Sequence, residues 1–321
     1  MKKTQFNSVF RSLLVAAVFS LLIAAQGQAG GLPGSGGHYP NGAEDFMVGA
    51  LPPPGTYLVN YMILAQKNSL SNKSLPPNDF NASVFAEVPR LIYVSPYSLF
   101  GASLAAHVFV PFYSADVTLK SPVPAPALNF DHNDKGLGDI IFSPLVFGWH
   151  FGPELHAVFA LDMWAPTGNY DKTNAATQVL SKNHWTFEPV LAVSYLKEGF
   201  DASIKLMYDF NTDNDNYLHP SGVTGKLSPG QEFHFDWALG YSLKNGLTGG
   251  VVGYNYWQVT DDEFNGAKDL NQKSQVGGIG LGLKYWPKMG PFSMTFKQYW
   301  EYNAKNIPTG PQTQFKIVYA F

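Results

Sequence analysis

The sequence predicts an all-β protein, namely a transmembrane antiparallel up-and-down β-barrel of about 12 strands with both chain ends on the periplasmic side. Three observations support this fold class. The chain ends in a strand with two different faces, short turns alternate with long polar loops, and aromatic residues fill one face of several strands while charged residues keep to the other. An aromatic content of 15% agrees with the aromatic girdles of such barrels.

The last nine residues, Thr313 to Phe321, alternate with a period of two. One face carries Phe315, Ile317, Tyr319 and Phe321, and the other carries polar or small residues. Closing the sheet into a barrel removes the aggregation-prone edge that such a strand would otherwise expose. We expect Phe315, Tyr319 and Phe321 to form an assembly signal for the barrel-assembly machinery. A core strand of a soluble β-protein is the alternative for these residues alone.

The N-terminus has the features of a secretory signal peptide over residues 1–29. Three basic residues precede an apolar run from Leu13 to Ala25, and small residues lead to a cleavage site near Ala29. The apolar run is shorter than the ~20 residues that span a bilayer. Without those three, 18 of the 21 basic residues remain against 24 acidic ones, a net charge of −6 that suggests no nucleic-acid partner. The chain has no cysteine, so disulfides contribute nothing to its stability.

Residues 30–55 are rich in Gly and Pro and have no periodicity, so they are neither strand nor helix. Two interpretations remain open for this segment. It is either a disordered periplasmic tail or a plug folded into the barrel mouth. Its apolar residues Phe46, Met47 and Leu51 are the plug candidates, because a solvated tail would not need them.

The barrel is expected over residues 56–321. The predicted strands are 56–66, 84–94, 98–109, 138–150, 155–165, 184–196, 200–211, 232–243, 247–258, 275–286, 292–303 and 312–321. Short turns are expected at 95–97, 152–154, 197–199, 244–246 and 287–290, and long loops at 67–83, 113–137, 166–183, 212–231, 259–274 and 304–311. Short periplasmic turns alternating with long outer loops are what an up-and-down outer-membrane barrel requires.

Three successive strands indicate which face meets lipid. From 184 to 196 one face is apolar, with Trp185 and Tyr195 ten residues apart at its ends, and the other contains Glu188. Ten residues at ~3.3 Å rise and ~40° tilt cover about 25 Å of depth, the height of the apolar band of a barrel. The strands at 200–211 and 232–243 repeat the pattern, so lipid is the expected environment of their aromatic faces.

An ordered set of short motifs resembles a known family. They are H-Y-P-N-G-A-E-D-F (His38 to Phe46), A-L-P-P-P-G-T-Y (Ala50 to Tyr57), G-L-G-D-I-I-F-S-P (Gly136 to Pro144) with Trp149, A-P-T-G-N-Y-D (Ala165 to Asp171) and Y-N-Y-W-Q-V-T-D-D (Tyr254 to Asp262). Together they resemble the outer-membrane family of the meta-pathway of phenol degradation, and within it the SphA-like, sphingosine-induced branch. The resemblance implies an outer-membrane barrel that transports aromatic or lipid-like compounds, and it provides no catalytic residues.

Charged and aromatic side chains on the inward registers are the candidate lumen or substrate-path residues. They are Arg90, His107, His156, Asp162, Trp164, Glu188, Lys205, His234 and Asp236. Inward charges of both signs must pair or bind something, so a structural ion-pair network and a role in gating or ligand contact both remain open. Arg90 is the only arginine after the signal peptide, and we expect it to make a bidentate contact with a lumen carboxylate.

The pairs His156/Asp162 and His234/Asp236 suggest no catalytic or metal site. Residues of one strand that share a face lie ~7 Å or more apart, too far for direct contact, so each would need a partner from another strand. The stretch from Asp209 to Pro220 lacks the Gly and Glu of a calcium loop. We therefore expect no catalytic residue, no metal and no cofactor.

The function predicted is passive uptake of small hydrophobic compounds, aromatic or long-chain, through a channel in the bacterial outer membrane. Apolar residues assigned inward, Leu58, Met62 and Leu64 with Val158 and Trp164, suit such a ligand. A structural or adhesive barrel and a lipid-modifying enzyme are the alternatives. The expected partners are outer-membrane lipids, lipopolysaccharide, the assembly machinery and the hydrophobic ligand.

Overall fold

The computed structural model describes residues 36–70, 79–120, 129–219, 222–270, 273–287 and 290–321. The predicted signal peptide, and with it cleavage near Ala29, lies outside these ranges. No helix in the described part of the chain is both long and apolar enough to cross a membrane.

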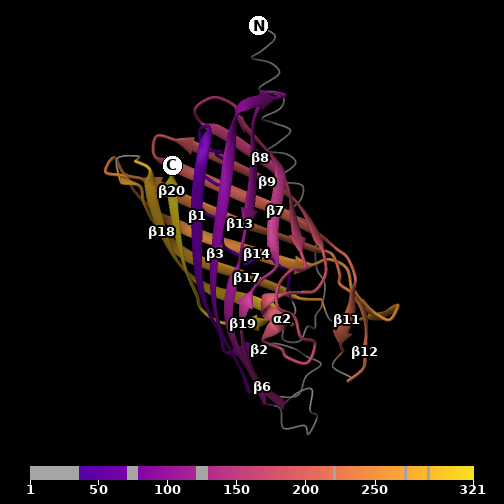
Figure 1. The fold of residues 1–321 in the computed structure, drawn as a ribbon. Coiled ribbons are helices and arrows are strands. Elements are labelled where there is room, and N and C mark those ends of the chain that lie inside the picture. The colour runs from indigo at the N-terminus through magenta and orange to yellow at the C-terminus, as the bar shows by residue number, and fades with distance from the viewer. Residues whose placement is uncertain (1–35, 71–78, 121–128, 220–221, 271–272, 288–289) are drawn as a thin grey trace.

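Twelve antiparallel strands close into a barrel, as predicted (Figure 1). They are β1 (Gly55–Lys67), β3 (Asp79–Leu99), β4 (Ala102–Phe109), β7 (Ile140–His150), β8 (Leu155–Ala165), β9 (Thr186–Lys197), β10 (Phe200–Asn211), β13 (Glu232–Ser242), β14 (Leu247–Gln258), β17 (Gln275–Tyr285), β18 (Phe292–Lys305) and β20 (Gln312–Ala320). β1 pairs with β20 on one side and with β3 on the other, so the barrel has no free edge.

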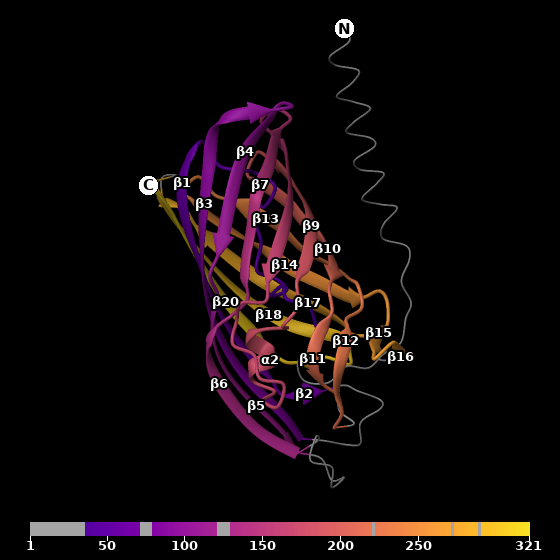
Figure 2. The ribbon, with the colours of Figure 1, turned by 45° about the vertical axis from the view of Figure 1, so that its right-hand side comes forward.

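Several predicted loops contain further strands. β5 (Phe112–Lys120) and β6 (Asn129–Leu137) form a hairpin that extends the wall beyond the barrel, where α2 (Thr177–Leu180) packs against it (Figure 2). β11 (Asn214–Leu218), β12 (Thr224–Ser228), β15 (Asp262–Phe264) and β16 (Ala267–Asp269) form a separate sheet, and β2 (Ser69–Leu70) pairs with β19 (Pro308–Thr309). The expectation of a loop over 113–137 was therefore wrong. Ala115, Val117 and Leu119 are buried and alternate with polar residues, which is a strand pattern.

The turn predicted at 95–97 lies further along the chain. β3 continues through Pro96, and the turn is made by Phe100 and Gly101, both with positive φ. Pro96 is tolerated because the pairing with β1 ends at Val94, so its missing N–H leaves no gap in that ladder.

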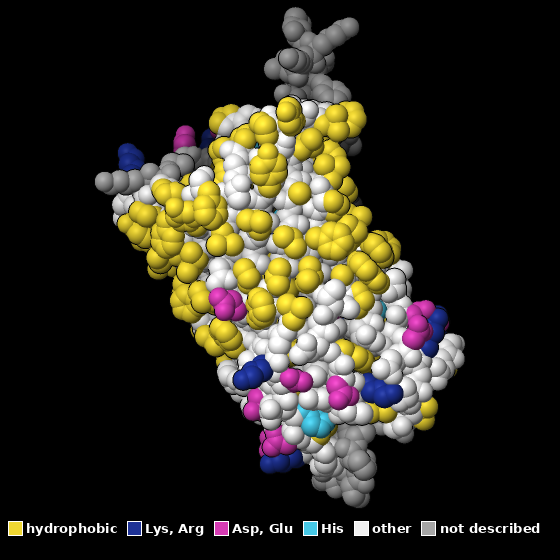
Figure 3. Space-filling model, in the orientation of Figure 1, with side chains coloured by type: hydrophobic (Ala, Val, Ile, Leu, Met, Phe, Trp, Pro, Cys, Tyr) yellow, Lys and Arg dark blue, Asp and Glu magenta, His cyan; other side chains and the backbone are white. Residues whose placement is uncertain are grey.

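The outer and inner faces of the wall differ as the three oriented strands predicted. Leu239 is 49% exposed on the outer face, whereas its neighbour Ala238 is 1% exposed on the inner face. On the face shown in Figure 3, hydrophobic side chains cover the barrel from the short-turn end past its middle, and most charged ones lie toward the end with the long loops.

On β1 the assignment was reversed. Leu58, Met62 and Leu64 point outward, and Val59, Tyr61 and Ile63 are buried inside. β1 carries apolar residues on both registers, so hydrophobicity alone gives no direction for it. Val158 and Trp164 do face the lumen.

Candidate functional site: a plugged barrel lumen

Residues 36–54, called the plug segment below, run through the lumen. The segment contacts the long-loop end through His38, the middle through Tyr39 to Asp45, and the short-turn end through Phe46 to Leu51. At its C-terminal end it leads into β1 at Gly55. The described residues of this segment thus contact the inner face of the wall from one end of the barrel to the other.

Glycines in the wall make room for the apolar side chains of the plug segment. A Cβ atom on Gly240 would come within 2.5 Å of the Phe46 ring, and one on Gly148 would come within 2.6 Å of Leu51. Phe46 is 3% exposed and packs with Ala238, Val252 and Tyr254. Met47 has a positive φ, its N–H donates to Ser203, and its sulfur lies 3.6 Å from the Lys284 ammonium. The sequence of the wall is thus matched to that of the segment inside it.

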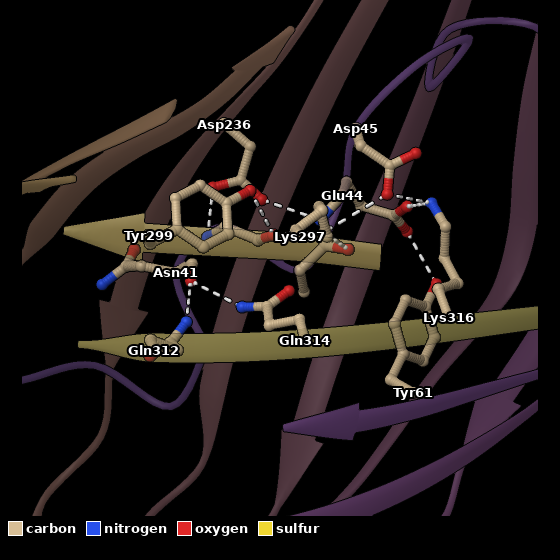
Figure 4. A network of polar contacts seen from close by, with 12 residues as sticks. Asn41, Glu44, Asp45, Tyr61, Asp236, Lys297, Tyr299, Gln312, Gln314 and Lys316 are labelled. Atoms are coloured by element: carbon tan, nitrogen blue, oxygen red, sulfur yellow. Dashed lines mark hydrogen bonds and ion pairs between the residues drawn. The ribbon is translucent and has the colours of Figure 1, made fainter. Parts of the chain in front are cut away.

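Five charged groups, called the charged latch below, hold the middle of the plug segment, and all of them except Arg90 are labelled in Figure 4. They are Glu44, Asp45, Arg90, Lys297 and Lys316. Asp45 lies 3.2 Å from the Lys297 ammonium and 2.7 Å from that of Lys316, while Glu44 lies 3.0 Å from Arg90 and 3.3 Å from Lys316. Both acids come from the plug segment and all three cations come from the wall, so each ion pair ties one to the other.

Backbone contacts reinforce the latch. The Lys297 ammonium also donates to the carbonyl oxygens of Gly42 and Ala43, and the Tyr299 hydroxyl donates to Gly42. From β13, Asp236 accepts the N–H of Gly42 at 2.8 Å, the N–H of Glu44 at 3.0 Å and the Tyr39 hydroxyl at 2.6 Å. A carboxylate with three such donors fixes the turn of the plug segment in one conformation.

His38 fixes the plug segment at the long-loop end. Its Nε2 lies 2.9 Å from Asp139 and its Nδ1 lies 2.9 Å from the Thr186 hydroxyl, and its ring stacks on Trp164. Burial raises the pKa of Asp139, but the hydrogen bond from His38 and backbone N–H groups outweigh it and hold this pKa below its usual value. His184 packs edge-on against His38, and burial lowers the pKa of His184 to about 3. This end is therefore built around an ionised Asp139 and a neutral His184.

The space left in the lumen forms a row of cavities. A cavity of about 250 Å³ lies at the short-turn end and one of about 230 Å³ lies at the long-loop end. Between them is a waist of about 30 Å³, whose walls include Tyr39, Tyr61, Phe109, Tyr113 and Trp164. The waist shares Glu44, Tyr61, Asp162 and Lys205 with the first cavity, and Tyr39, Ile63, Tyr113 and Trp164 with the second. The three spaces thus follow one another along the lumen.

Most of the predicted lumen residues come together here. His107, Asp162, Trp164, Glu188, Lys205, His234 and Asp236 are all buried inside the barrel. Arg90 donates one N–H to Glu44 and another to His107 Nδ1 at 2.9 Å, and His107 Nε2 in turn donates to Asp162 at 2.9 Å. The expected bidentate contact of Arg90 with one carboxylate was therefore wrong, because His107 takes its second bond.

His156 lies apart from the others. It is near the short-turn end, where its Nδ1 is 2.7 Å from that of His150. For His234 and Asp236 the sequence argument was correct that each needs a partner from elsewhere. His234 meets Asp209, and Asp236 meets the plug segment.

Sequence reasoning missed the latch residues Glu44, Asp45, Lys297 and Lys316, and also His38. A usable signal was present, since the acidic pair Glu44-Asp45 directly precedes the apolar plug candidates, and Lys297 and Lys316 stand on inward registers without a nearby acid. Their pairing across more than 250 residues depends on the barrel closing around the segment.

The fold and the site define a closed β-barrel of the outer-membrane type with its own N-terminal segment in the lumen. Residues 55–317 match the family described as "Putative MetA-pathway of phenol degradation", and the chain belongs to that family. No curated protein matches the sequence.

Solved structures that share the fold include the following two. The COG4313 outer membrane channel from Pseudomonas putida F1 is 16% identical, with a TM-score of 0.70 over 86% of this chain and 98% of that one. The transport unit of the autotransporter AIDA-I from Escherichia coli is 8% identical, with a TM-score of 0.52 over 83% of this chain and 90% of that one.

Proposed function

We propose that this protein is an outer-membrane channel through which small hydrophobic compounds, aromatic ones among them, diffuse without energy input. The observation that carries the proposal is the row of two large cavities joined by an aromatic-walled waist. Membership in a phenol-degradation family and the likeness to a protein described as an outer membrane channel agree with it.

The sizes of the cavities suit a single ring. A cavity of roughly 150 Å³ lined by apolar residues binds benzene, and both end cavities are larger than this. Val146, Val158 and Val190 line the short-turn cavity, beside the charges of Lys205 and Asp162. Apolar walls with a few polar groups are typical of sites for small organic ligands.

The waist controls passage. At about 30 Å³ it holds a water or two but no ring, so Tyr39 and its neighbours must move for a ligand to pass. The plug segment supplies Tyr39, Pro40, Ala43 and Glu44 to this waist. In the proposed mechanism, ligand occupancy of an end cavity competes with the contacts of the plug segment and opens the waist.

The orientation in the membrane belongs to the same proposal. The end with the short turns and Phe321 faces the periplasm, and the charged long-loop end faces lipopolysaccharide and the medium (Figure 3). The signal peptide is removed near Ala29, and outer-membrane lipids surround the apolar band.

Filling the short-turn cavity tests the proposal. Ala160 is 3% exposed and lines this cavity, so Ala160→Trp should obstruct it, whereas Leu161→Trp changes the neighbouring, 40% exposed residue on the lipid face. We expect Ala160→Trp to slow entry of phenol and toluene into proteoliposomes severalfold and Leu161→Trp to leave it unchanged. Equal rates for wild type and Ala160→Trp, with both proteins folded, would contradict the channel assignment.

A further inference from the structure

A row of carboxylates crosses the lumen wall beside the start of the plug segment. Asp162 on β8 is paired in register with Glu188 on β9, and Asp209 on β10 is paired with Glu232 on β13. Met207 pairs with Val190 and Phe210 with Phe187, which places Asp209 beside Glu188. Four acids on four consecutive strands thus lie at one level, although like charges on neighbouring strands repel.

The partners available to these four acids are unequal. Asp162 accepts from His107, and Asp209 lies 3.2 Å from His234 Nε2. Glu188 is fully buried, and neither of its oxygens accepts a hydrogen bond from any described residue. Nδ1 of His234 and Oε2 of Glu232 also have no hydrogen-bond partner within the described chain. Buried carboxylates without donors are costly unless a cation or a proton neutralises them.

The geometry of the group suits a metal ion. One ligand atom each from Glu188, Asp209 and His234 lie within 4.8 Å of one another. Ligands about 2.1 Å from a common ion are at most about 4.2 Å apart, so small side-chain rotations would complete the site. One imidazole nitrogen with carboxylate oxygens is a donor set that Zn²⁺ and related transition metals accept, whereas Ca²⁺ and Mg²⁺ favour oxygen alone.

We propose that Glu188, Asp209 and His234 form a binding site for one divalent transition-metal ion, with Glu232 beside it as a fourth donor. The plug segment covers this site. A Cβ atom on Gly37 would lie 2.3 Å from Glu232 Oε2 and 3.1 Å from Asp209 Oδ2, so any larger residue there would displace the Glu232 carboxylate. A bound ion would join β9, β10 and β13 directly beneath the start of the plug segment.

Zn²⁺ titration of chelator-treated protein by calorimetry tests the site. We expect wild type to bind one Zn²⁺ at the proposed site. Glu188→Gln and His234→Gln should each lower the affinity for Zn²⁺ by roughly 100-fold or more, beyond the 10–100-fold loss caused by changes in residues that only support the ligands. Asp201→Asn is the matched control, since Asp201 is a buried acid on β10 that accepts from Ser203 outside the cluster. Zn²⁺ should also raise the melting temperature of wild type and of the control, but not of the two site variants.

Two further measurements make the test decisive. The exposed His150 and the half-buried His156 have rings close enough to bind Zn²⁺ themselves, so the titration is repeated on His156→Gln, where the proposed site should persist. Metal-free Glu188→Gln should fold at least as well as wild type because it removes an unpaired charge, which separates loss of binding from loss of fold. The proposal would be overturned by any of three results: no saturable Zn²⁺ binding, equal Zn²⁺ binding by the site variants and wild type, or binding of Ca²⁺ alone. The charge of the buried carboxylates would then be neutralised by protons shared between them.

Discussion

Lys297→Met should release the plug segment. The fully buried Lys297 ammonium pairs with Asp45 at 3.2 Å and donates to the carbonyl oxygens of Gly42 and Ala43. Removing one partner of a buried ion pair costs about 3–5 kcal/mol. The substitution destabilises only the state in which the plug segment is bound in the lumen. Since 1.4 kcal/mol corresponds to a tenfold change in an equilibrium constant, a cost of about 3 kcal/mol would raise the population of the released state roughly 150-fold.

Cysteine labelling measures this population directly, since the natural chain contains no cysteine. Ala43→Cys introduces a buried thiol in the plug segment, 6% exposed in the alanine form, and its maleimide reaction rate follows the released fraction. The rate should rise by the same factor, roughly 150-fold, when Lys297→Met is added. Lys226→Met, which removes an exposed partner of Asp213 in the long loops, should leave the rate unchanged. Equal rates with and without Lys297→Met would refute the latch.

Three further outcomes follow from the wall, the long-loop end and the C-terminus. Leu239→Asp places a charge in hydrocarbon at a cost of about 2 kcal/mol or more, whereas Ala192→Asp places one in the short-turn cavity. Outer-membrane yield should therefore fall for Leu239→Asp and stay unchanged for Ala192→Asp. Equal yields would contradict the assignment of the two faces. The lowered pKa of His184 keeps it neutral in the folded state and lets it protonate when unfolded, so the stability that it contributes above about pH 6.5 is lost as the pH falls toward 3. Melting curves should therefore show a smaller acid-induced loss for His184→Leu than for wild type, and identical losses would contradict this. Deletion of Phe321, which is 76% exposed beside Tyr319, should leave the protein in the periplasm by cell fractionation, and normal outer-membrane yield would reject the assembly signal.

The lipid-facing wall could be predicted because hydrocarbon imposes a simple rule on each strand. On β9, β10 and β13 every charged residue lies inside, as period-two alternation predicts, except Lys197, which ends β9 beside the short turn and pairs with Glu154. For β14 the sequence did not indicate which face meets lipid, because Gly249, Gly250 and Gly253 interrupt the alternation of apolar and polar residues. Gly253 leaves space for the Trp237 ring, which is a property of a neighbouring strand and is invisible in β14 itself.

The lumen could be predicted only as a set of inward residues, without their partners. The chain Glu44, Arg90, His107 and Asp162 joins the plug segment, β3, β4 and β8. The link from Glu44 to Arg90 depends on the path of a segment with no periodicity, and the other two depend on the arrangement of β3, β4 and β8 in the wall. Likewise, Glu188, Asp209 and His234 are separated along the chain and meet only through the register of three strands.

Planar-bilayer conductance of the full-length protein and of a form lacking residues 30–55 tests the central claim most directly. Full-length protein should conduct weakly, because the plug segment narrows the lumen to the waist of about 30 Å³. The truncated form should conduct strongly, and phenol or a long-chain amine should raise the conductance of the full-length protein toward that level. Equal conductance of the two forms, with no response to either compound, would contradict a plugged channel for hydrophobic molecules and would favour a structural barrel.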